Sequence, residues 1–167
     1  IYRTLWGFFP DNVNYGLRLA AAQNAAGKGK DALETLEAIR KLPAPDSGDP
    51  RIDIEEAYSA KSLSDFRRQQ SAASAGVKKA TEQGAHLLVA RARMVEGDAY
   101  LNLGEPQKAT ASWEDARRLY AEAGDRGGGA RALNNMGTVF YQQGDLPEAR
   151  KKYEESQIVA RDLGDAK

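Results

Sequence analysis

Residues 130–160 read ARALNNMGTVFYQQGDLPEARKKYEESQIVA, and this stretch decides the fold of the chain. Its first part carries apolar side chains three and four residues apart, which is the spacing of one face of an α-helix. These side chains are Leu133, Met136 and Phe140. Gly144-Asp145 then interrupts the pattern, because glycine readily ends one helix and aspartate caps the next. The stretch therefore opens with a helix followed by a tight turn.

The second part of the stretch predicts another helix. Asp145 can cap it, and Glu148 three residues later would complete a capping box. The residues at helical spacing on its inner face are Ala149, Tyr153, Ser156 and Val159. Gly164 lies where a glycine would end the helix. The whole unit is predicted to be a helix, a turn and a helix.

The chain repeats this unit at a spacing of 40 residues. Three arginines and three glycines share the spacing, and they are Arg51, Arg91, Arg131, Gly84, Gly124 and Gly164. A period of roughly 20 to 50 residues is typical of a solenoid of stacked supersecondary units. Such a stack presents an extended concave surface, so the repeat favours a binding function over catalysis.

The repeated residues resemble the tetratricopeptide repeat. That pattern has a bulky residue, Leu-Gly and an aromatic residue on the first helix, then Ala, an aromatic residue and Ala on the second. The matching residues of the last two repeats are Leu133, Met136-Gly137, Phe140, Ala149, Tyr153 and Ser156, preceded by Gly97, Tyr100, Gly104, Ala109, Trp113 and Ala116. The long spacing resembles members such as kinesin light chains, and the sequence is also similar to repeat regions of bacterial signalling proteins.

This resemblance implies an all-α fold, a right-handed α-solenoid of helix–turn–helix repeats. We expect one domain over residues 1–167, made of a half repeat and four repeats. Their bounds are 1–12, 13–49, 50–89, 90–129 and 130–167. The repeat at 50–89 has small or polar residues on its packing face, which predicts thin packing and the lowest local stability. Because the chain opens at Ile1 inside an apolar pattern, we expect it to be a fragment of a larger protein.

Glycines and prolines predict where the helices end. Turns within repeats are expected near Gly27, Ser64, Gly104 and Gly144, and turns between repeats near residues 43–49, 84–88 and 124–129. Gly127-Gly128-Gly129 is interpreted as a flexible hinge in the last of these. Inside the helices, Gly97 and Gly137 would each cost ~1 kcal/mol relative to alanine, so close approach of the partner helix must offset that cost. Trp113 and Tyr153 are expected to fill the space beside these contacts.

The composition argues against several classes of function. Lys plus Arg and Asp plus Glu number 24 each, so the zero net charge disfavours nucleic-acid binding and a polybasic membrane attachment. The chain has no cysteine, which excludes disulfides and thiolate metal sites. No apolar run approaches the ~20 residues of a membrane span. We therefore expect a cytoplasmic protein with no nucleic-acid and no membrane partner.

No catalytic or metal site can be assembled from the sequence. His86 is the only histidine and lies near a repeat boundary, where it is interpreted as an ordinary helix-start residue. Gly27-Lys28-Gly29-Lys30 lacks the Gly-x4-Gly-Lys-Ser/Thr frame of a phosphate-binding loop and is interpreted as a turn. We expect no enzyme activity, no cofactor and no metal.

The first helix of each repeat lines the concave face in tetratricopeptide arrays, so the resemblance identifies candidate groove residues. They are Asn14, Arg18, Arg51, Glu55, Tyr58, Arg91, Val95, Asp98, Asn102, Arg131, Asn134, Asn135, Thr138 and Tyr141. Arg51, Arg91 and Arg131 would form a ladder along one wall, and guanidinium groups suit carboxylates. The resemblance further implies that Asn135 clamps a peptide backbone. The expected ligand is an acidic or C-terminal peptide, with an Arg51–Glu55 pair on one helix as the alternative role for that arginine.

The predicted function is a scaffold module that binds proteins or extended peptides, as the sensory or regulatory part of a larger signalling protein. One alternative is an architectural spacer or oligomerisation arm without a peptide ligand. A second is a nucleic-acid-binding helical repeat, which the neutral charge disfavours. Trp6, Phe8 and Phe9 are interpreted as core residues whose partner helix lies upstream, rather than as a docking patch. An open solenoid end of this kind predicts self-association through the N-terminal end.

Overall fold

The structure, a computed structural model, describes residues 1–165, and every regular element in that range is helical. The elements are α1 (Tyr2–Phe8), α2 (Val13–Ala25), α3 (Gly29–Arg40), the short 3₁₀ helix η1 (Asp46–Gly48), α4 (Pro50–Ser62), α5 (Phe66–Glu82), α6 (His86–Asn102), α7 (Pro106–Glu122), α8 (Arg126–Gln142) and α9 (Leu146–Asp165). The all-α fold predicted from the sequence is therefore confirmed.

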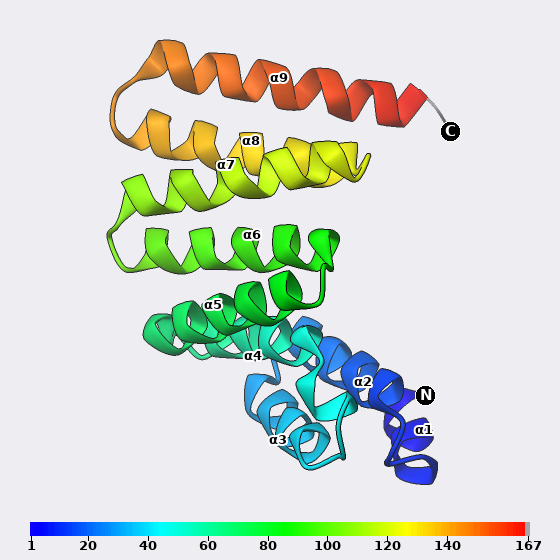
Figure 1. Ribbon diagram of the computed structural model, residues 1–167. Coiled ribbons are helices and arrows are strands. Elements are labelled where there is room, and N and C mark those ends of the chain that lie inside the picture. The colour runs from blue at the N-terminus through cyan, green and yellow to red at the C-terminus, as the bar shows by residue number, and fades with distance from the viewer. Residues whose placement is uncertain (166–167) are drawn as a thin grey trace.

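The helices stack in chain order into a solenoid (Figure 1). Each helix packs on the next one in the sequence, and α2, α4 and α6 also contact one another in succession. The solenoid therefore has an inner row formed by α2, α4, α6 and α8, and an outer row formed by α3, α5, α7 and α9. His86 and Arg126 begin α6 and α8, so these equivalent helices start 40 residues apart.

The same three-residue turn joins most of the helices. Its middle residue has a positive φ, and these residues are Gly27 (71°), Ser64 (59°), Gly84 (65°), Gly104 (77°), Gly124 (72°) and Gly144 (80°). The next backbone N–H donates to the carbonyl oxygen five residues earlier, as from Asp145 to Phe140 at 2.9 Å. This Schellman pattern satisfies carbonyl groups that a helix end leaves without partners. The turns predicted within the repeats are confirmed, and Ser64 adopts there a conformation that glycine reaches at lower cost.

Three details of the sequence interpretation are wrong. Gly127-Gly128-Gly129 is no hinge, because it lies in the first turn of α8, where the Gly128 N–H donates to Asp125 at 2.8 Å. An aspartate cap can start a helix through glycines because it satisfies their free N–H groups. Gly164 lies inside α9 rather than beyond it. Asp145 accepts from the Glu148 N–H at 3.2 Å, but its own N–H bonds to a carbonyl of α8, so the expected capping box is half formed.

Close helix contacts occur at the two mid-helix glycines, as predicted. A Cβ on Gly97 would lie 2.4 Å from Nε1 of Trp113, and one on Gly137 would lie 2.9 Å from Cε1 of Tyr153. Trp113 is 1% exposed, and its indole N–H donates to the Met94 carbonyl oxygen at 3.1 Å. The missing side chain of each glycine therefore lets a large ring of the second helix reach the backbone of the first.

The α4–α5 pair combines a thin apolar core with buried charges. The core cluster consists of Ala57, Ala72, Ala73 and Val95, with Tyr58 packed against it. Asp53 is 3% exposed, and its carboxylate oxygens lie 2.8 Å from Arg40 and 2.8 Å from Lys79. Glu56 pairs with Arg40 at 2.6 Å and with Arg68 at 2.7 Å. The thin packing is confirmed, whereas these charges, which tie α3, α4 and α5 together, were not predicted from the sequence.

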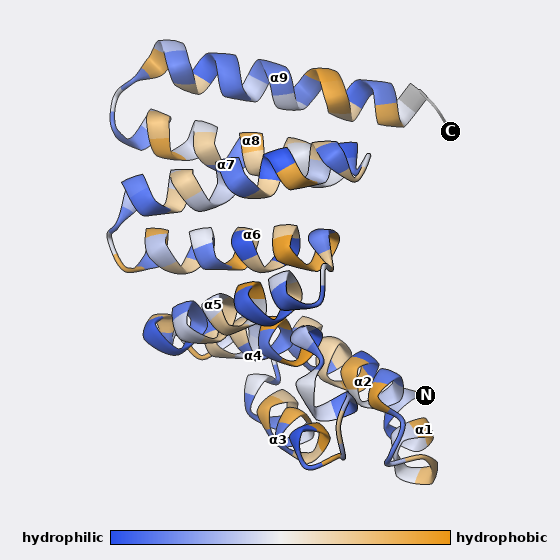
Figure 2. Cartoon of the chain, viewed as in Figure 1, coloured by the Kyte–Doolittle hydropathy of each residue, from blue (hydrophilic) through white to orange (hydrophobic). Residues whose placement is uncertain are grey.

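Apolar side chains are exposed at both ends of the stack. Trp6 is partly buried and packs against the core between α2 and α3, while Phe8 and Phe9 are 74% and 52% exposed. Figure 2 shows α9 as mostly hydrophilic, and Leu146 and Ile158 are exposed among its few hydrophobic residues. None of the helices in residues 1–165 is both long and apolar enough to cross a membrane.

Candidate binding groove

A continuous groove runs along the inner row of helices. It consists of four adjoining hollows of about 240, 570, 610 and 210 Å³. Neighbouring hollows share lining residues: Arg91 lines three of them, and Tyr58, Asp98 and Asn135 line two each. The groove therefore extends without a break from α2 to α8.

The structure places nearly all of the predicted groove residues on this surface. The lining includes Asn14, Arg18, Arg51, Glu55, Tyr58, Arg91, Val95, Asp98, Asn102, Arg131, Asn134, Asn135 and Thr138. Tyr141 is different, because it is 63% exposed near the end of α8 and lines none of the four hollows. That these residues bind a peptide stays a prediction.

The three arginines of the predicted ladder differ in their contacts. Arg51 pairs with Asp49, the N-cap of its own helix, and its Nη1 donates to Asn14 at 3.0 Å. Arg91 and Arg131 form no ion pair and no side-chain hydrogen bond with any residue in the described range 1–165. Two guanidinium groups therefore face the groove with their donors free, whereas the third is already engaged.

Glu55 faces Arg91 without forming an ion pair. Its carboxylate accepts a hydrogen bond from Nδ2 of Asn24 at 3.1 Å. Burial raises the pKa of Glu55, and the bond from Asn24 and the charge of Arg91 lower it in part. The alternative pairing of Glu55 with Arg51 is not formed, because Arg51 pairs with Asp49 instead. The guanidinium of Arg91 thus forms no ion pair with either acidic neighbour on its side of the groove, Glu55 or Asp49.

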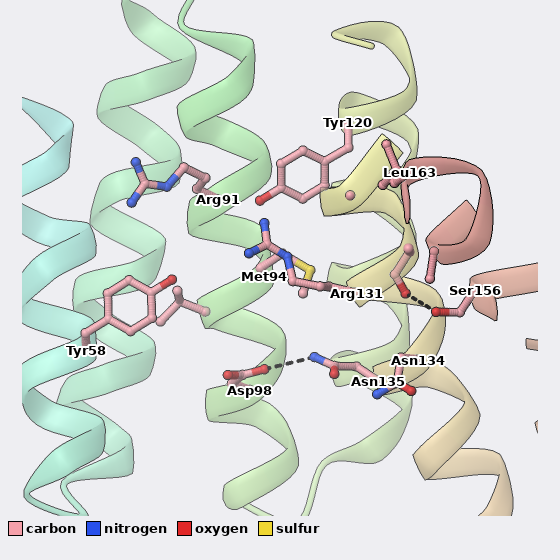
Figure 3. Close-up of a pocket in the computed structure, with 14 residues that line it drawn as sticks. Tyr58, Arg91, Met94, Asp98, Tyr120, Arg131, Asn134, Asn135, Ser156 and Leu163 are labelled. Carbon is pink, nitrogen blue, oxygen red and sulfur yellow. Dashed lines mark hydrogen bonds between the residues drawn. The ribbon is translucent and has the colours of Figure 1, made fainter. Parts of the chain in front are cut away.

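An acidic residue interrupts the basic wall toward the last hollow. Asp98 pairs with Nζ of Lys61 at 2.6 Å and accepts a hydrogen bond from Nδ2 of Asn135 at 3.4 Å (Figure 3). Thr138 accepts a hydrogen bond from the Tyr153 hydroxyl at 3.1 Å. This end of the groove is thus neutral and rich in amide and hydroxyl groups, and a peptide clamped by Asn135 would compete with Asp98.

Two tyrosines face the largest of the four groove hollows together with the two arginines (Figure 3). Tyr58 comes from α4 and Tyr120 from α7, and neither hydroxyl is hydrogen-bonded to a residue that the structure describes. Burial raises the pKa of Tyr58 and that of Tyr120, while the charges of Arg91 and Arg131 lower both in part. Both phenols therefore stay protonated at neutral pH and can donate hydrogen bonds.

Tyr120 was not predicted as a groove residue because it lies on an outer helix. A Cβ on Gly128 would lie 2.5 Å from its ring, so this glycine of α8 makes room for the ring between α7 and α8. The residues 40 positions before and after Tyr120 are Ala80 and Ala160. A tyrosine at a position where the other repeats have alanine is the signal that could have identified Tyr120. Other lining residues absent from the prediction include Lys61, Met94, Ser156 and Leu163.

Comparison with known proteins identifies the repeats. The tetratricopeptide repeat family matches residues 86–161, which include all of α6, α7 and α8. No curated protein sequence matches the chain. The crystal structure of MamA is similar with a TM-score of 0.74 at 19% identity, covering 98% of this chain and 87% of MamA. BtubC (BKLC) from P. vanneervenii gives 0.76 at 17% identity, covering 96% and 68%. A Podosopora anserina kinesin light chain with nearly identical TPR-like repeats gives 0.55 at 12% identity, covering 92% and 97%.

At these identities the solved structures show the fold and carry no further functional detail. Tetratricopeptide repeats typically form non-catalytic scaffolds for protein–protein interaction. The helix–turn–helix units, the glycine–aromatic contacts between their helices and the family match together show that residues 86–161 are similar to tetratricopeptide repeats.

Proposed function

We propose that the inner groove binds an extended, acidic segment of a partner protein, and that the chain acts as the sensory or regulatory module of a cytoplasmic signalling protein. The observation that carries the binding proposal is the joining of four hollows into one groove along α2, α4, α6 and α8. A long shallow groove suits an extended chain better than a compact small molecule, because each hollow can take one or two side chains.

The charges of the groove support an acidic ligand. The acidic residue Asp98 is paired with Lys61, and Arg51 is paired with Asp49, so these charges largely cancel. Arg18 and Glu55 also line the groove and carry opposite charges, so the net charge left over equals that of Arg91 and Arg131, which form no ion pair with another described residue. Guanidinium groups bind carboxylates through paired hydrogen bonds.

A peptide-display screen tests the proposal. The chain is offered a library of random linear peptides, and the affinity of enriched peptides is measured by calorimetry. We expect acidic peptides whose affinity falls about tenfold or more in the Arg91→Ala/Arg131→Ala variant, because each lost charge-assisted bond is worth ~1.5–3 kcal/mol. The matched control is Arg117→Ala/Arg118→Ala, which removes two arginines from the outer helix α7.

Both double variants should keep the helical circular dichroism of the parent, since all four side chains lie at the surface or line the groove. The proposal is wrong if no peptide is enriched, or if enriched peptides lose the same affinity in both variants.

An architectural arm is the second candidate, because apolar side chains are exposed at the N-terminal end. Ile1 and Phe8 are 96% and 74% exposed, which favours self-association there. A molar mass that rises with concentration, and that returns to the monomer value in Phe8→Ser, would support this function. A constant monomer mass up to high concentration would exclude it.

A further inference from the structure

The largest of the four groove hollows gathers four side chains that donate no side-chain hydrogen bond to another residue of the range 1–165. Arg91 comes from α6, Arg131 from α8, Tyr58 from α4 and Tyr120 from α7. Tyr120 is 1% exposed, and Figure 3 shows its hydroxyl at the same side of the hollow as the guanidinium of Arg131. Arg131 is exposed and Arg91 and Tyr58 are half-buried, so their donors are open to the space of about 610 Å³ that they surround and are available to an acceptor placed in it.

The acidic residues nearby do not supply that acceptor. Glu55 accepts from Asn24 and makes no ion pair with Arg91. Asp98 lines the hollow but pairs with Lys61 and accepts from Asn135. Two positive charges and two neutral donors therefore remain for a ligand.

Apolar side chains line one part of the hollow, beside the polar Asn134, Asn135 and Ser156. Met94 lies on α6, Ala130 on α8, and Ala160 and Leu163 on α9. These groups offer no hydrogen bonds, so the part of a ligand that they contact must be apolar. The hollow thus combines an anion site with a wall for a ring or an alkyl chain.

We infer that this hollow binds a phosphoryl group on a side chain of the partner segment, held by Arg91, Arg131, Tyr58 and Tyr120. The inference rests on the proposed function, because it names the modification that the groove recognises. A phosphomonoester carries about −1.5 to −2 charges at neutral pH and three strong acceptor oxygens. A carboxylate carries one charge on two oxygens, which would leave the charge of one guanidinium uncompensated.

Two small ligands of similar shape but different charge test whether the hollow prefers a dianion. Phenyl phosphate and benzenesulfonate both attach three oxygens in a tetrahedral arrangement near a ring, but at pH 7.5 the first is mainly a dianion and the second a monoanion. We expect the isolated chain to bind phenyl phosphate about tenfold more tightly, measured by NMR titration. Equal affinity, or tighter binding of benzenesulfonate, would overturn the inference.

Point variants then locate the site. Tyr120→Phe keeps the ring between the helices and removes the donor, so it should weaken phenyl phosphate about fivefold or more. Arg131→Gln should weaken it by about tenfold or more. The matched controls Tyr141→Phe and Arg118→Gln lie outside the groove and should change affinity less than about twofold. If Tyr120→Phe and Arg131→Gln, with unchanged circular dichroism, also stay within that limit, the site is not the one inferred.

Binding of a phosphotyrosine hexapeptide tests whether the phosphoryl group belongs to a peptide or to a small phosphate ester. Tighter binding of the peptide than of phenyl phosphate supports a phosphorylated partner segment, because the neighbouring hollows then contribute. Equal affinity would assign the hollow to free phosphate esters and overturn the peptide part of the inference. The proposed function can fail separately, because the display peptides carry no phosphate. Acidic peptides that bind in the groove would support it even if the hollow binds phenyl phosphate no more tightly than benzenesulfonate.

Discussion

The contact between Gly97 and Trp113 predicts a strong non-additivity between two substitutions. A Cβ on Gly97 would lie 2.4 Å from the indole Nε1, far inside the ~3.5–4.0 Å of an ordinary contact between heavy atoms. Trp113 is 1% exposed and its N–H is bonded to Met94, so the ring cannot move aside freely. Gly97→Ala should therefore destabilise the protein by ~1–3 kcal/mol through overpacking.

The sign of this effect should reverse when the ring is removed. Trp113→Ala alone is expected to cost ~3–5 kcal/mol, because it empties a buried space. In that background, Gly97→Ala meets no ring and gains the helix propensity of alanine, worth up to ~1 kcal/mol. The coupling energy between the two positions should then amount to ~2–3 kcal/mol, at the upper end for residues in contact.

Urea unfolding followed by far-ultraviolet circular dichroism measures the four free energies. The dependence of the unfolding free energy on urea concentration should have the same slope in all four proteins. A lower slope would show that the repeats unfold separately, and the four free energies could then not be compared. Gly129→Ala is the control, since a Cβ there meets no atom within 4 Å and the substitution should be neutral or stabilising. Equal destabilisation by Gly97→Ala in both backgrounds would refute the reasoning.

Two further predictions concern a turn and a buried carboxylate. Ser64→Gly should stabilise the protein by ~1 kcal/mol, because Ser64 has a φ of 59° where the other turns of this type place glycine. The reverse change Gly104→Ser should cost a similar amount, and an unchanged unfolding midpoint for both would contradict the account of the turn. Burial raises the pKa of Glu55, so the folded state binds its proton more tightly than the unfolded chain does. This contribution to stability is complete below the unfolded pKa and is lost as the pH rises through the folded pKa. Glu55→Gln should therefore leave stability at pH 7 unchanged or increased, and should flatten its pH dependence above about pH 4.5; a loss of stability in thermal unfolding at pH 7 would refute this.

Local patterns in the sequence were sufficient for the helices, the turns and the inner face. A helical glycine such as Gly97 requires a close neighbour, and the spacing of 40 residues assigns Trp113 to that place. Most of the predicted groove residues line the groove, because one register fixes the inner face of every repeat. The three consecutive glycines Gly127-Gly128-Gly129 led to the wrong prediction of a hinge, because the cap from Asp125 outweighs the low helix propensity of glycine.

The sequence patterns did not predict the interactions between residues that only the folded structure brings together. Arg51 pairs with Asp49 rather than with Glu55, because an N-cap carboxylate lies nearer to its guanidinium than a residue one turn ahead. The ion pairs of Asp53 join helices α3, α4 and α5, and no single helix period shows them. Tyr120 enters the groove from an outer helix, which the rule for inner-face positions does not include.

One link in the chain differs from all the others in length. Three residues connect each pair of helices from α4 to α9, whereas nine residues, 41–49, connect α3 to α4. Figure 1 shows α2 and α3 inclined to the row of α6 to α9 beyond this link. Arg91 borders the two hollows lined by α2 and α4 as well as the hollow lined by α6 and α8. A guest that fills the whole groove must therefore contact helices of both inclinations as it passes Arg91, which suits a chain with a freely turning backbone better than a straight, stiff rod such as a long polyproline segment.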